Sequence, residues 1–118
     1  MKIKQILNEN PSVTEELKEF FLKVILKSLE KSEKVPEDFK NILKKEGITD
    51  TLLLGYLEST PRLICDFMDE RDVIIGIINH GENHWNFSIN GKEDDSYYES
   101  RVKAEYASVI GSILEYIK

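Results

Sequence analysis

Residues 73–91 read VIIGIINHGENHWNFSING, and this stretch decides the fold class. Its first six residues are apolar on both faces, which is typical of a central strand that is covered on each side. Apolar and polar residues then alternate up to Asn90-Gly91, a dipeptide that favours a tight turn. The stretch therefore predicts two antiparallel strands, at about 73–79 and 84–90.

A third strand is predicted just before this stretch, at about 62–68. After Pro61, Leu63, Cys65 and Phe67 alternate with the residues between them, and a charged turn follows. We therefore expect a three-stranded antiparallel meander. A further short strand from Ser96 to Tyr98 is left open.

The segments before the meander have helical periodicity. Apolar residues three and four apart predict a helix at about 13–31, preceded by a capping box at Ser12 and Glu15. Pro36 is expected at the first position of a second helix, about 36–46, which ends at Gly47. A third helix is favoured at about 50–58, although this leucine-rich run fits a strand as well.

The chain ends in a predicted helix at about 97–117. Ser96 and Glu99 form a second capping box, and small residues such as Gly111 indicate a close approach to the sheet. The expected inner face consists of the larger apolar residues, Val102, Tyr106, Val109, Ile110, Ile113 and Ile117. Together these elements predict a single α+β domain over residues 1–118.

The composition argues against several classes of function. The 118 residues carry a net charge of −6, which disfavours sequence-independent nucleic-acid binding and attraction to anionic membranes. The single cysteine, Cys65, excludes an intramolecular disulfide and is expected in the core. Because no signal peptide or membrane-spanning run is visible, we expect a cytoplasmic protein.

The negative charge is concentrated in one part of the chain. Residues 1–60 carry 10 basic and 11 acidic side chains, whereas residues 66–99 carry nine acidic and only two basic ones. Aromatic residues lie among these acids. Carboxylates beside tyrosines are typical of a surface that binds a basic partner. The expected partner-binding residues are Glu82, Glu93, Asp94, Asp95, Tyr97 and Tyr98, and the alternative is a surface that is acidic only for solubility.

Two other functions remain open. His80 and His84 flank one turn that contains Glu82, and these three residues form a candidate for a metal site or a small enzyme. The wide apolar face of the first predicted helix fits a structural or assembly subunit that forms a homo-oligomer through it. No nucleophile, phosphate-binding or dinucleotide-binding motif is present, so we expect a non-catalytic protein without a cofactor.

The second half of the chain resembles small uncharacterised phage and mobile-element proteins. The resemblance rests on Trp85 to Gly91 and on Tyr98-Glu99-Ser100-Arg101 ahead of an alanine-bearing helix, within residues 62–118. It implies a binding role, either as a phage inhibitor of a host defence protein or as an immunity-type inhibitor of a basic toxin. The leading hypothesis is thus a small acidic protein that docks a basic protein surface.

Overall fold

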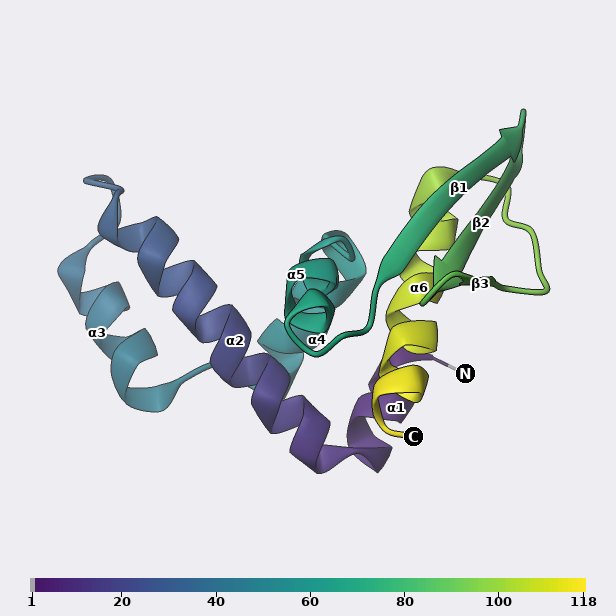
Figure 1. The fold of residues 1–118 in the computed structure, drawn as a ribbon. Coiled ribbons are helices and arrows are strands. Elements are labelled where there is room, and N and C mark those ends of the chain that lie inside the picture. The colour runs from purple at the N-terminus through teal and green to yellow at the C-terminus, as the bar shows by residue number, and fades with distance from the viewer. Residues whose placement is uncertain (1) are drawn as a thin grey trace.

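In the computed structural model, which describes residues 2–118, the chain forms six helices and a three-stranded antiparallel sheet (Figure 1). The predicted α+β class is confirmed. The elements in chain order are α1 (Ile3–Glu9), α2 (Pro11–Glu30), α3 (Glu37–Glu46), α4 (Asp50–Ser59), α5 (Leu63–Asp69), β1 (Ile75–Gly81), β2 (His84–Ile89), β3 (Lys92–Glu93) and α6 (Arg101–Tyr116).

The sheet has the order β1-β2-β3, so its central strand is β2, and the expectation of a central strand at 73–79 is wrong. The two strands predicted at 73–79 and 84–90 are confirmed as β1 and β2, with Ile77 opposite Phe87. Gly81 and Asn83 both have positive φ angles, of 139° and 59°, which the tight turn between the strands requires. The hairpin therefore follows the local pattern of the sequence.

The strand predicted at 62–68 is wrong, because this segment is the helix α5. The residues that α5 buries are Ile64, Phe67 and Met68, and their spacing of three and four is that of a helix. The apparent period of two arose because apolar residues occupy both sets of alternate positions. The third strand is instead β3, which follows the Asn90-Gly91 turn and pairs with the end of β2.

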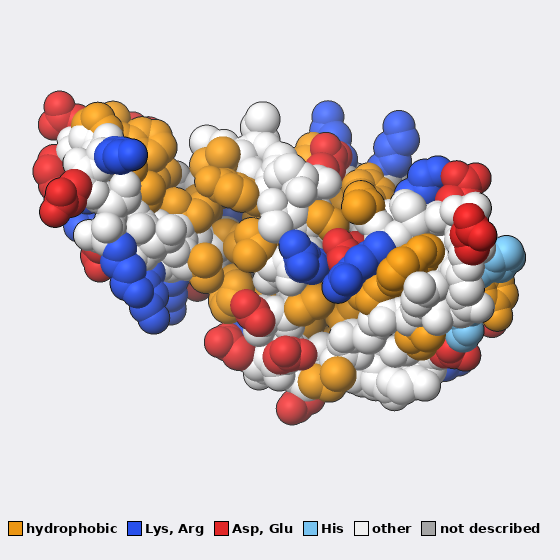
Figure 2. Space-filling model, turned by 90° about the horizontal axis from the view of Figure 1, so that it is seen from above, with side chains coloured by type: hydrophobic (Ala, Val, Ile, Leu, Met, Phe, Trp, Pro, Cys, Tyr) orange, Lys and Arg blue, Asp and Glu red, His pale blue; other side chains and the backbone are white. Residues whose placement is uncertain are grey.

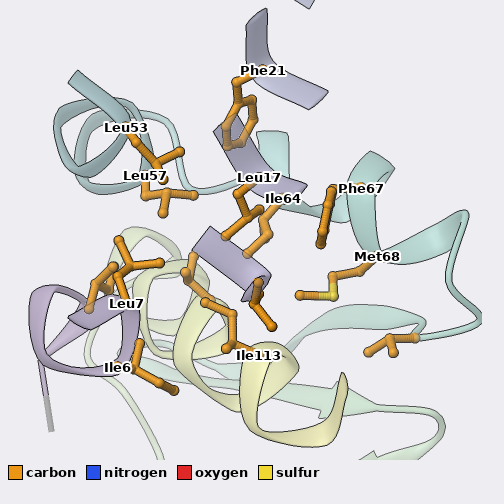
Figure 3. Close-up of a cluster of buried hydrophobic side chains, with 14 of the residues drawn as sticks. Ile6, Leu7, Leu17, Phe21, Leu53, Leu57, Ile64, Phe67, Met68 and Ile113 are labelled. Carbon is orange, nitrogen blue, oxygen red and sulfur yellow. The ribbon is translucent and has the colours of Figure 1, made fainter. Parts of the chain in front are cut away.

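Helix α6 lies between the sheet and the other helices (Figure 1). On one side its Val109 and Ile113 belong to the main hydrophobic core, together with buried side chains of α1, α2, α4 and α5. Figure 3 shows these side chains converging from the surrounding helices. On the other side α6 packs against Phe87 and Ile89 of β2. The core is thus helical, and α6 attaches the sheet to it.

The predicted close approach of α6 to the sheet is confirmed at Gly111. A Cβ atom at this position would lie 2.8 Å from Cε2 of Phe87 and 3.1 Å from its Cζ. Ala104, which lies two turns earlier in α6, is fully buried. Small side chains therefore set the distance between α6 and the sheet.

The predicted inner face of α6 is partly wrong. Val102 is 66% exposed and Ile117 is 40% exposed, whereas Ser108 and Ser112 are buried. Each serine hydroxyl donates a hydrogen bond to a carbonyl oxygen of its own helix, to Glu105 at 2.6 Å and to Val109 at 2.9 Å. Because this bond satisfies the hydroxyl, a serine can occupy a buried position that the hydrophobic pattern does not reveal.

The helix ends also differ in part from expectation. The N-cap of α2 is Asn10, so the box at Ser12 does not form, and α6 begins after Ser100, whose hydroxyl accepts from Lys103 N, rather than after Ser96. Pro36 is an N-cap rather than the first helical residue.

The helix favoured at 50–58 is confirmed as α4, and α1 was not predicted. No helix within the described chain combines the length and apolarity needed to cross a membrane.

The sheet is not covered on both faces, contrary to the expectation for Val73 to Ile78. Helix α6 packs on the face that carries Phe87 and Ile89. On the opposite face Ile74 is 53% exposed, although Ile78 and Ser88 are partly buried. A sheet with one open face leaves side chains free to form a surface there.

We predict that Gly111→Ala and Gly55→Ala change stability in opposite directions. A new Cβ at position 111 would collide with the buried ring of Phe87, at a cost of roughly 1–3 kcal/mol that exceeds the gain of about 1 kcal/mol in helix propensity. At Gly55, also within a helix, a new Cβ would meet no atom within 4 Å beyond its neighbours and the local helix backbone, so only the gain in helix propensity remains. Urea unfolding of both variants measures the difference, and equal stabilisation would contradict this packing.

Candidate functional site

The acidic residues of segment 66–99 do not form one continuous patch. Four of them lie on α5 and the following turn, ahead of β1, and these are Asp66, Asp69, Glu70 and Asp72. The others lie on the hairpin and on the chain from β3 to α6, along the opposite edge of the sheet. Figure 2 shows the acidic side chains on one face of the molecule as separate groups. The predicted partner-binding residues all belong to the second group.

The chain from Asp94 to Tyr98 is fixed against the side of β2 that faces away from β1. Tyr98 and Trp85 exchange two backbone hydrogen bonds, of 2.7 and 2.8 Å, and Asp94 N donates to Phe87 O at 2.9 Å. The buried side chain of Asn86 donates to Asp94 O at 3.1 Å. The short strand left open at 96–98 is thus a single bridge at Tyr98. Asn86, which the alternation pattern places among exposed residues, is a structural residue of the site.

Tyr98 and Asp94 support the loop and are only partly accessible. The Tyr98 hydroxyl donates to Asp94 Oδ2 at 2.9 Å, and its ring packs on Phe87 with centroids 6.0 Å apart. Burial, followed by the interaction with the Asp94 carboxylate, raises the pKa of Tyr98 to about 12. Two of the six predicted partner-binding residues therefore hold the loop in place.

Tyr97 projects from this loop toward the hairpin and is 60% exposed. Its ring makes edge-to-face contacts with His80 and His84, with centroid distances of 5.4 and 6.0 Å. His80 Nε2 lies 3.2 Å from Glu93 Oε1, so β1, β2, β3 and the loop meet at this point. We call the exposed side chains of Glu82, Glu93, Asp95 and Tyr97, with the two histidines, the hairpin-end surface.

The proposed metal ligands do not converge. His80 pairs with Glu93, whereas His84 Nδ1 lies 2.9 Å from the backbone oxygen of Glu82 rather than from its carboxylate. Among residues 2–118 no group of three or more histidine, cysteine or acidic side chains is placed to hold a metal ion. The geometry therefore gives the metal hypothesis no ligand set.

Cys65 lies on α5 and is half-buried, so it is less enclosed than expected for a core residue. Burial, with a smaller effect from Asp69 and Asp66, raises the pKa of its thiol. A thiol with a raised pKa is mostly protonated at neutral pH and is a poor nucleophile. This environment favours a structural role for Cys65.

A cleft of about 360 Å³ lies between α1, α2 and α4, and the sequence did not reveal it because its walls come from distant segments. Leu7, Thr14 and Leu54 contribute to its lining. At its edge Lys18 pairs with Asp50 and, at 3.2 Å, with Glu15. The hydrogen bond to Asp50 is the main reason that the pKa of Lys18 is raised. Since both carboxylates engage this lysine, its charge is already balanced within the protein.

Within residues 2–118, the hairpin-end surface is thus where the predicted site residues and an exposed aromatic side chain occur on neighbouring elements. Glu82, Glu93, Asp95 and Tyr97 are exposed there, and Asp94 and Tyr98 form the support beneath them. Comparison of the chain with protein-family models, with curated proteins and with solved structures found no match.

We predict that Tyr98→Phe lowers stability by about 1 kcal/mol at neutral pH, because the hydrogen bond to Asp94 is lost. The raised pKa of Tyr98 means that its phenol stabilises the fold below pH 10 and that this stabilisation is lost as the pH rises toward about 12. The difference in the free energy of unfolding between wild type and Tyr98→Phe, measured in urea, should therefore decrease over this pH range. Tyr97→Phe is the matched control, and an equal pH response in both variants would refute the assignment.

Proposed function

We propose that this chain is a small, non-catalytic binding protein whose hairpin-end surface docks a basic surface of a partner protein. The observation that carries the proposal is the exposed ring of Tyr97, which contacts His80 and His84, with Glu93 paired to His80 beside it. An exposed tyrosine on an acidic segment of the chain combines an aromatic anchor with electrostatic attraction.

The sign of the charge favours a basic partner. Lys92 is the only basic residue between Arg71 and Arg101. It is adjacent to Glu93 in β3, and side chains of neighbouring strand residues point to opposite faces of the sheet. The face that carries the Glu93–His80 pair therefore lacks the Lys92 side chain. Such a surface speeds association with a basic protein, and the effect weakens as salt increases.

The rigidity of the surface supports protein docking. The backbone of the Tyr97 loop is fixed on β2 by the bonds at Asp94 and Tyr98, and the hairpin turn is tight. A surface that is ordered before binding loses little conformational entropy when the partner arrives. Inhibition of a basic host defence protein or of a basic toxin remains the kind of role that we propose for it.

The proposal is tested by NMR titration of the ¹⁵N-labelled protein with a nona-arginine peptide. The largest amide shift changes should fall at residues 81–84 and 93–97, and added salt should reduce the affinity. The double variant Glu82→Lys, Asp95→Lys should weaken binding by about tenfold or more, since it reverses two exposed charges at the surface.

The matched control is Glu33→Lys, Glu46→Lys. These two glutamates are exposed, take part in no ion pair within the described chain, and lie around α3, away from the sheet. The control changes the net charge by the same amount, so it should retain most of the affinity. Equal losses in both double variants, or the largest shift changes around Asp66 to Asp72, would overturn the proposal.

A further inference from the structure

Strand β1 is an outer strand of the sheet, and one side of its backbone faces no other strand (Figure 1). Ile74 O accepts from Asn90 N at 2.8 Å, so the backbone of Ile74 is directed toward β2. Because backbone groups alternate along a strand, those of Gly76 and Ile78 also face β2. The N–H and C=O groups of Ile75, Ile77 and Asn79 therefore point away from the sheet.

These outward groups have no partner within residues 2–118. No turn, loop or side-chain hydrogen bond reaches the backbone N–H or C=O of Ile75, Ile77 or Asn79. The partner that can pair with these groups is another extended strand, whose backbone donors and acceptors alternate in the same way.

The strand also lacks the features that usually protect an edge. From Val73 to Asn79 it contains neither proline nor a charged residue, and β-branched residues predominate. Its bulge lies only at the end, between Asn79 and Gly81. An uncharged strand of this kind offers a basic partner nothing to recognise, in contrast to the hairpin-end surface.

We propose that the occupant of this edge is a second copy of the same chain, with the two β1 strands antiparallel about a two-fold axis at Ile77. In this register Ile77 faces its counterpart, and Ile75 of each copy faces Asn79 of the other. Every outward N–H and C=O of the three residues then gains a partner. The result is one continuous sheet with both α6 helices on the same face.

The side chains favour this self-pairing. The register places Ile78 of one copy opposite Gly76 of the other, on the open face of the sheet. Gly76 has no side chain and already lies close to Ser88, since a Cβ there would be 2.7 Å from Ser88 Oγ. The small residue thus leaves space for the isoleucine of the second copy, and Ile78 is partly exposed in the single chain.

This dimer differs from one formed through the first predicted helix. Four apolar residues of α2 are already partly buried within the chain, namely Leu22, Ile25, Leu26 and Leu29. Val24 is more exposed than these, at 39%. A helix offers no unpaired backbone along its side. The edge of β1 does, and it is independent of the surface proposed to dock a basic partner.

Sedimentation equilibrium from about 1 μM to about 1 mM tests the dimer. The wild-type chain should associate to a dimer, more strongly at high salt because each copy carries a charge of −6. Asn79→Pro removes an outward N–H and should weaken association by about tenfold or more. Asn79→Ala is the matched control, because it loses the same side-chain bond to Gly81 N but keeps the backbone N–H.

An isotope-filtered NOE experiment on mixed ¹³C-labelled and unlabelled wild-type protein decides the register, even if Asn79→Pro does not fold. A contact between the α-protons of Gly76 and Ile78 of different copies is expected, since facing residues without mutual hydrogen bonds lie closest. A monomer at every concentration, a dimer without this contact, or equal association of the two folded Asn79 variants would overturn the proposal.

Discussion

The position of α6 between the sheet and the helical core is the constraint on which the rest of the structure depends. The sheet has few other contacts with the helices, so the packing of Phe87 against Gly111 holds it in place. The opposite side of α6 contributes Val109 and Ile113 to the core. Helix α6 therefore packs against the sheet and the helical core at the same time. Only small residues on its sheet side allow it to lie close enough to β2.

This arrangement explains where a binding surface can form. Because α6 occupies one face of the sheet, the other face and the hairpin remain available. The loop that leads into α6 passes along β2, where the bonds at Trp85 and Asp94 fix it. Tyr97 is consequently presented by backbone that is ordered at both ends, which is the property that a docking surface needs.

Much of the fold was predictable because the determining signals are local. The apolar run of β1, the alternation in β2 and the short turn between them specify the β1–β2 hairpin from neighbouring residues alone. The segment now seen as α5 was not predictable, because its burial pattern becomes visible only once other helices pack on Ile64 and Phe67. The same difference holds for the candidate site. Its carboxylates were predictable from the local charge, whereas the contact of Glu93 with His80 depends on the pairing of strands.

Native-state hydrogen exchange tests most directly the claim that α6 joins the sheet and the helical core into one cooperative unit. The amides of Ser88 in β2, which faces β1, of Val109 in α6 and of Leu57 in α4 should exchange with the same opening free energy, equal to that of global unfolding. If the amide of Ser88 instead opens at a markedly lower free energy while the other two stay protected, the sheet unfolds independently and the claim is contradicted.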